Sequence, residues 1–132
     1  MLSVKNKVNA RIMERLKTDA DAPYYAKDLF FSSTNQGTPA EMPCLNIVSL
    51  GEPQTGNDLE HNSQNFIIST IELRSYDKKS ITNAIKLLDL AGDVMISMRY
   101  ELIMGIEDIS DSSAKIAVAR FRRLVGAGDT LY

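Results

Sequence analysis

The sequence predicts an α+β protein in which two main helices pack on one face of an antiparallel or mixed sheet of about four to five strands. Two observations carry this prediction. Apolar residues recur every three to four positions in two segments, as in helices, and alternate or run together in four others, as in strands. These segments follow the order helix, strand, strand, helix, strand, strand. With 132 residues, 44% apolar and 24% charged, the chain 1–132 fits a single globular domain.

The first helix is expected over residues 3–18, where Ser3 can cap the N-terminus. Its apolar stripe recurs every four residues, at Val4, Val8, Ile12 and Leu16. Residues 19–42 break this pattern with prolines, a glycine and a polar run, which is typical of a long loop. Large apolar residues within this loop predict a short strand or turn of helix laid against the core; they are Tyr24, Tyr25, Leu29, Phe30 and Phe31.

Two strands are expected next, at residues 43–50 and 65–76. Successive residues of a strand point to opposite faces. The second strand therefore places apolar side chains on one face, at Ile67, Ile71 and Leu73. The connection 54–64 between the two strands is polar and long for a hairpin, so a second long loop is expected there.

The clearest helical pattern spans residues 80–98. Its apolar positions step by three and four residues, at Ile81, Ala84, Ile85, Leu88, Ala91, Met95 and Met98. A strand follows, with alternating apolar residues at Tyr100, Leu102, Met104 and Ile106. An acidic turn at 107–113 and a last strand at 115–125 are expected after it, and residues 126–132 are expected to form a flexible tail.

The total charge of the chain does not favour a general attraction to nucleic acids or membranes. The 15 basic and 17 acidic residues give a formal net charge of −2, and no stretch approaches the roughly 20 apolar residues of a membrane span. The start of the chain also lacks the apolar run of a signal peptide. The first helix is nevertheless basic, and later loops are acidic. Separated patches of opposite sign can attract copies of one protein head to tail, although ordinary solvated faces give the same pattern.

No catalytic, cofactor or metal site is expected. The one histidine, His61, and the one cysteine, Cys44, are far apart in sequence, which disfavours zinc ligation and a Cys-His nucleophile. A lone cysteine is typical of a buried thiol in a reducing compartment. The run 126–128 follows a strand without a helix behind it, so it is not a phosphate-binding loop. An acidic cluster lacks the spacing of a calcium loop and is better interpreted as a hairpin tip; it comprises Glu107, Asp108 and Asp111.

Several features of the sequence, taken together, carry a resemblance to a known family. They are the basic first helix, the long loop, the strand that begins at Pro43, and the segments Arg74-Ser75-Tyr76-Asp77, Ala91-Gly92-Asp93-Val94-Met95 and Ala119-Arg120-Phe121-Arg122. In this combination the chain resembles the tail terminator, or tail completion, proteins of long-tailed bacteriophages. The resemblance spans most of the chain.

The resemblance implies an α+β protein without enzymatic activity that assembles as a six-membered ring on the end of a finished tail tube. Such a ring stops further addition of tail tube protein and offers a joining surface to the neck and head-completion proteins. The protein would be assembled in the host cytoplasm and belong to the virion. DNA would pass through the ring without specific binding, which an acidic lining favours by repulsion. The acidic loop with Glu107, Asp108 and Asp111 is a candidate for that lining.

Contacts between subunits are expected to use basic residues from two segments of the chain: Lys7, Arg11, Arg15, Arg120, Arg122 and Arg123. The long loops 19–42 and 54–64 are expected to make axial contacts. Three alternatives stay open. The protein could be a head-closure or head-tail adaptor component of the neck, a small α+β ligand-binding domain, or an enzyme with a pocket that holds His61 near Glu72 or Asp77.

Overall fold

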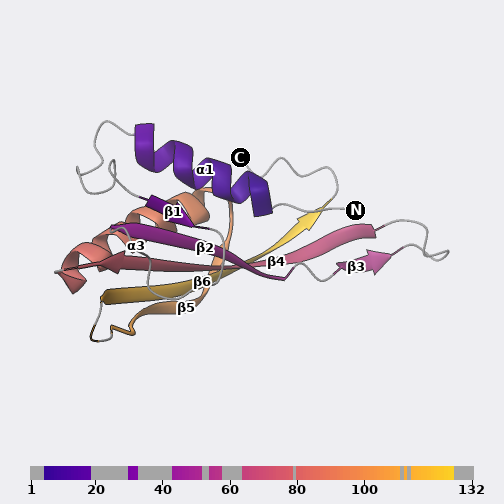
Figure 1. The fold of residues 1–132 in the computed structure, drawn as a ribbon. Coiled ribbons are helices and arrows are strands. Elements are labelled where there is room, and N and C mark those ends of the chain that lie inside the picture. The colour runs from indigo at the N-terminus through magenta and orange to yellow at the C-terminus, as the bar shows by residue number, and fades with distance from the viewer. Residues whose placement is uncertain are drawn as a thin grey trace.

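The computed structural model describes most of the predicted elements, over residues 5–18, 30–32, 43–51, 54–57, 64–78, 80–110, 112 and 114–126. In chain order the helices and strands are α1 (Lys5–Thr18), β1 (Phe30–Ser32), β2 (Cys44–Gly51), β3 (Gln54–Asn57), β4 (Gln64–Asp77), α3 (Ile81–Ser97), β5 (Glu101–Asp108) and β6 (Lys115–Gly126). Both helices lie on the same side of the sheet, as Figure 1 shows. The predicted α+β class and the order of the main elements are confirmed.

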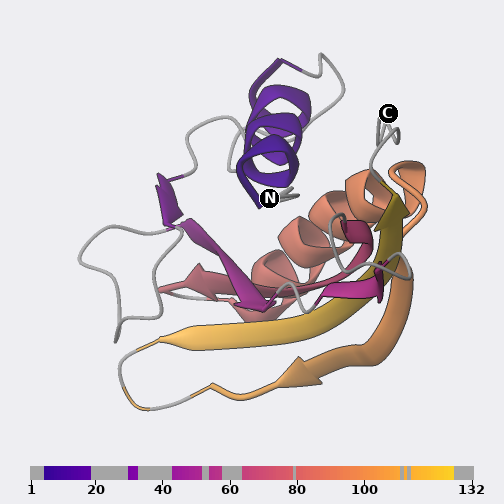
Figure 2. The same ribbon diagram turned by 90° about the vertical axis from the view of Figure 1, so that its right-hand side faces the viewer.

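The sheet has six strands in the order β1-β2-β4-β6-β5, and β3 pairs with the N-terminal part of β4. β1 runs parallel to β2, and all other pairs are antiparallel, so the sheet is mixed. The longest pairing joins β4 to β6, from Phe66 opposite Gly126 to Asp77 opposite Lys115. Figure 2 shows α1 above the β1–β2 side of the sheet and β5 at the opposite edge, with α3 between them.

The main core lies between the two helices and the sheet. The predicted stripe of α1 is buried at Val8, Ile12 and Leu16. Every second residue of β4 and β6 points toward the helices, because successive residues of a strand face opposite sides of the sheet, and residues paired across the two strands share a side. The members from these strands are Ile67, Ile71, Leu73, Ala117, Ala119, Phe121 and Val125. A smaller buried cluster of Cys44, Tyr76, Ala114 and Ile116 lies apart from this core.

Helix α3 begins at a side-chain cap. The Ser80 hydroxyl accepts a hydrogen bond from the Asn83 N–H at 3.3 Å, and the Ser80 N–H donates to an Asp77 carboxylate oxygen at 2.9 Å. The helix ends where Arg99 takes a left-handed backbone conformation, with φ 66°. Among the described residues, neither helix has both the length and the apolar character needed to cross a bilayer.

Two expectations about the strands are corrected. The connection 54–64 was expected to be a loop, but residues 54–57 form β3; their polar side chains give no strand pattern, and pairing with β4 through the backbone defines the strand. The turn expected at 107–113 begins only after Asp108, because β5 continues to that residue. The apolar part of the loop 19–42 does contain a short strand, β1. The rest of that loop and residues 127–132 lie outside the described residues.

Candidate assembly surface

The edge strand β5 is the most exposed of the strands whose side-chain burial the structure describes. It pairs with β6 along one side, and every residue except Met104 is exposed. Three large apolar side chains are nevertheless among them, with exposed fractions of 47% for Leu102, 43% for Ile103 and 38% for Ile106. An uncovered edge strand with apolar side chains is a template for contact with another chain. β5 is therefore the first candidate for an assembly surface.

The residues of β5 do not alternate as the sequence predicted. The register with β6 shifts between Leu102 and Met104, and again between Met104 and Glu107. Leu102 lies opposite Phe121 on the helix side of the sheet, whereas Met104 lies opposite Arg120 on the other side. The expectation that both point to one face is wrong, because bulges add residues to one strand and change the side to which the next residues point.

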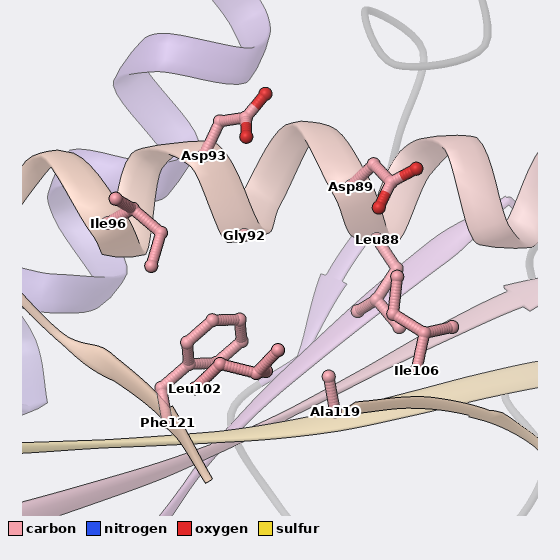
Figure 3. A pocket seen from close by; sticks show the side chains of 9 residues that line it. All are labelled: Leu88, Asp89, Gly92, Asp93, Ile96, Leu102, Ile106, Ala119 and Phe121. Atoms are coloured by element: carbon pink, nitrogen blue, oxygen red, sulfur yellow. The ribbon is translucent and has the colours of Figure 1, made fainter. Parts of the chain in front are cut away.

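A groove with a volume of about 150 Å³ lies between α3 and β5. Figure 3 shows its lining, which consists of Leu88, Asp89, Gly92, Asp93, Ile96, Leu102, Ile106, Ala119 and Phe121. Leu88, Ala119 and Phe121 are buried and form the floor, while Ile96 is 54% exposed. The two carboxylates, Asp89 and Asp93, come from the α3 side and are exposed. We call this the acidic groove.

Gly92 allows the floor of the acidic groove to approach α3 closely. A β-carbon placed on Gly92 would lie 3.3 Å from the ring Cζ of Phe121, which is tighter than ordinary packing. The glycine costs the helix about 1 kcal/mol relative to alanine. Its place in α3 is therefore explained by the ring beneath it. The pair also joins the segments 91–95 and 119–122.

The basic residues predicted as contacts in the first helix form one strip on α1. Lys7, Arg11 and Arg15 follow one another at intervals of four residues, so they lie on neighbouring turns of one side. Lys7 and Arg15 are exposed. The Arg11 side chain is 24% exposed, and its guanidinium lies 3.8 Å from the Glu14 carboxylate. We call this set the basic strip.

The three arginines predicted as contacts in β6 do not form one group. Arg120 and Arg122 project from the side of the sheet that faces away from the helices, whereas Arg123 lies on the helix side and is only 8% exposed. The alternation of a strand already implies this separation. Arg123 is therefore the least accessible of the three predicted contact residues of β6. Arg122 is exposed and lies opposite Glu101 of β5.

Arg120 takes part in an ion cluster that the sequence did not indicate. Its Nε donates to one Glu72 carboxylate oxygen at 2.8 Å, and the Nε of Arg74 donates to the other at 2.6 Å. The Glu72 side chain is only 5% exposed, whereas the Arg74 and Arg120 side chains are 30% and 44% exposed. Burial alone lowers the pKa of the Arg74 guanidinium, but its hydrogen bond and charge attraction to Glu72 hold that pKa above its ordinary value.

The acidic residues predicted for the channel lie at the end of β5 and beyond it. Glu107 and Asp108 are exposed there, and Asp111 lies outside the described residues. The turn after β5 is held by the Ile109 N–H, which donates to the Ile116 carbonyl at 2.8 Å, and by the Ser110 hydroxyl, which accepts from the Ile116 N–H at 3.0 Å. Ser110 also donates to Asp108 through its hydroxyl and its N–H.

We expect the Asp108 carboxyl to titrate below the usual range of aspartate. The hydroxyl and then the N–H of Ser110 favour the charged form and lower the pKa. Since the pKa is depressed in the folded protein, these bonds stabilise the turn above the usual aspartate pKa, and that contribution is lost as the pH falls through the folded pKa. In an NMR titration, the midpoint of Asp108 should be higher in Ser110→Ala than in the wild type. The control Thr82→Ala removes an exposed hydroxyl on α3 and should leave the Asp108 midpoint unchanged. Equal Asp108 midpoints in all three proteins would show that the Ser110 hydroxyl does not lower this pKa.

Metal binding and thiol chemistry were the other candidates considered from the residue types of the chain. They contain no group of three or more His, Cys, Asp and Glu side chains that could hold a metal ion. Cys44 is a free, buried thiol, and its burial raises its pKa. His61 lies outside the described residues. No protein-family model and no curated protein matches this chain.

Proposed function

We propose that this protein is a structural subunit that forms a ring on the end of a phage tail tube and acts as a tail terminator. The observation that carries the proposal is the apolar edge formed by β5 and the acidic groove beside it. This edge leaves large apolar side chains uncovered in the single chain. A surface of this kind is typical of proteins that assemble with other chains.

The groove is better suited to a protein contact than to a small ligand. Ligand pockets usually have volumes of roughly 300–1,000 Å³ and enclose most of their ligand. The acidic groove measures about 150 Å³ and is bordered by the exposed side chains of Ile96, Leu102 and Ile106. This comparison favours assembly over the ligand-binding alternative. The proposal is also supported by the resemblance to tail terminators, and Gly92 and Phe121, from two of the segments that carry it, pack closely against each other.

The proposed action needs no chemical step. A contact between two different surfaces, repeated around a closed ring, saturates laterally, so the assembly can grow only along its axis. If one axial face matches the tube protein and the other matches a neck protein, the ring ends polymerisation and provides the joining surface. Glu107 and Asp108 are proposed to line the channel, where their charge would keep passing DNA from binding. The ring would be assembled in the host cytoplasm and remain in the virion.

The proposal predicts a hexamer that limits tube growth. Native mass spectrometry of the purified protein should show six copies, and addition of the protein to polymerising tube protein should shorten the tubes seen by electron microscopy. A protein heated until it unfolds and then cooled serves as the control for non-specific effects. A monomer at micromolar concentration, or a ring that leaves tube length unchanged, would contradict the proposal.

Particles that lack the protein distinguish the terminator from the other neck components. Loss of a terminator is expected to give overlong tails, because nothing stops the addition of tube subunits. Loss of a head-closure or adaptor protein is expected to give tails of normal length beside heads that leak DNA. Normal tails beside leaking heads would therefore move the assignment to the neck alternative.

A further inference from the structure

We propose that the basic strip of α1 in one copy docks on the acidic groove of the next copy, so that one repeated contact closes the ring. The inference depends on the proposed function, because it specifies the lateral contact of that ring. Its first support is charge. Asp89 and Asp93 are exposed on the rim of the groove, and neither forms an ion pair within the part of the chain that the structure describes. Lys86, one turn before Asp89, does not line the groove.

The spacing of the charges is the second support. Asp89 and Asp93 are four residues apart, as are Lys7 and Arg11, and Arg11 and Arg15. Four residues of α-helix rise about 6 Å, so two helices lying side by side place successive cations opposite successive carboxylates. Both four-residue pairs of cations include Arg11, whose guanidinium also lies 3.8 Å from the Glu14 carboxylate, so Glu14 and the groove would share this cation. The two sets of charges therefore match in sign and in period.

The apolar lining of the groove fits the same occupant. Lysine and arginine carry long aliphatic stems that can cover apolar surface while their charged ends reach a polar rim. The side chains available for such cover are Ile96, Leu102 and Ile106, with exposed fractions of 54%, 47% and 38%. A basic helix laid across the groove would thus bury apolar surface and pair with carboxylates in the same contact.

Within one molecule α1 packs against α3, but among the described residues no ion pair joins the basic strip to Asp89 or Asp93. α1 lies over the β1–β2 side of the sheet and the groove lies beside β5 at the other edge, with α3 between them (Figure 2). A contact between two different surfaces of identical copies is heterologous, and it produces a ring when its rotation closes. The positions of α1 and the groove therefore satisfy the requirement for head-to-tail assembly.

Charge reversal on each surface tests the contact. The groove variant is Asp89→Lys with Asp93→Lys, and the helix variant is Lys7→Glu with Arg15→Glu. In either variant alone, like charges would face each other, and the protein concentration at which half the rings dissociate should rise by roughly 100-fold. Native mass spectrometry and light scattering of the eluting protein measure this shift. All four side chains are exposed, so folding should be retained, and circular dichroism checks it.

The mixture of the two variants gives the decisive result. The normal basic strip of the groove variant faces the normal groove of the helix variant, and the two reversed surfaces also match, so an equal mixture should reform rings in which the variants alternate. The control variant, Lys78→Glu with Lys115→Glu, changes the net charge as much as the helix variant does but on other exposed residues, and it should form rings normally.

The outcomes separate the contact from the function. The inference about the contact would be overturned if the groove variant and the helix variant each formed rings alone. It would also be overturned if both dissociated alone and did not assemble when mixed. In both cases a wild-type protein that forms rings would leave the proposed function intact. A wild-type protein that forms no ring would overturn both. Alternating rings in the mixture, seen as equal numbers of the two masses, would support the contact.

Discussion

Replacement of Phe121 by alanine is expected to lower the free energy of unfolding by about 3–5 kcal/mol. The ring is 4% exposed and lies beneath α3, where its Cζ is 3.3 Å from the position of a β-carbon on Gly92. Across the sheet it pairs with Ile71 on one side and Leu102 on the other. Its removal leaves a cavity that these fixed elements cannot close. Urea unfolding at one protein concentration measures the change, which should appear in the midpoint rather than the slope.

Leu124→Ala is the matched control for Phe121→Ala. Leu124 lies on the same strand, but it is 55% exposed on the other side of the sheet, so its loss should change stability by at most about 1 kcal/mol. Gly92→Ala provides a second check. The added methyl group should be tolerated better in the Phe121→Ala protein than in the wild type, because the ring that it would approach is gone. Additive effects of the two changes would contradict the packing described here.

Replacement of both Arg74 and Arg120 by methionine is expected to destabilise the protein by about 2–4 kcal/mol, less than for a fully buried pair because both arginines are partly exposed. The double change leaves the Glu72 carboxylate, 5% exposed, without the two guanidinium groups that donate to its oxygens. Urea unfolding measures the loss. Arg122→Met, an exposed neighbour on the same side of β6, should cost no more than about 0.5 kcal/mol.

A third change identifies the cause of that loss. Glu72→Leu, added to the double variant, removes the unpaired carboxylate and should restore most of the lost stability, because an ion cluster can often be replaced by apolar side chains without net cost. A triple variant as unstable as the double variant would show that the stems of the arginines, and not the burial of the carboxylate, account for the effect.

The helices and the central strand follow from side-chain periodicity. In α1 the stripe at Val8, Ile12 and Leu16 is fully or nearly fully buried, and in β4 Ile71 and Leu73 face the helices as predicted. These elements are predictable because each buries one face and exposes the other. Buried residues therefore recur about every 3.6 positions in a helix and every two positions in a strand.

The features that were not predicted depend on pairing between distant strands. β3 has no apolar pattern, and its only signature is its backbone pairing with β4. The bulges that turn Met104 away from Leu102 become visible only in the register with β6. The ion cluster likewise joins Glu72 to Arg120 across 48 positions of sequence. Side-chain patterns do not encode such register directly, since it is set by neighbouring strands.

The sequence predicts the basic residues of the candidate site but not the groove. The basic residues Lys7, Arg11 and Arg15 stand out in the sequence because they repeat at helical spacing. In the sequence, Asp89 and Asp93 are simply charged positions between the apolar residues of α3. Their importance depends on the groove beside them, which residues of α3, β5 and β6 line together.

The pairing of β4 with β6 also determines when the acidic groove can form during synthesis. During synthesis β4 emerges from the ribosome before α3 and β5, whereas its partner β6 follows both of them. Until β6 is added, α3 lacks the floor formed by Ala119 and Phe121, and the groove beside it does not exist. The pairing of β4 with β6 also joins distant parts of the chain, and such long-range pairing generally forms slowly. A nascent chain therefore has no groove with which to contact a neighbour prematurely, and the proposed ring would form only after β6 has been added.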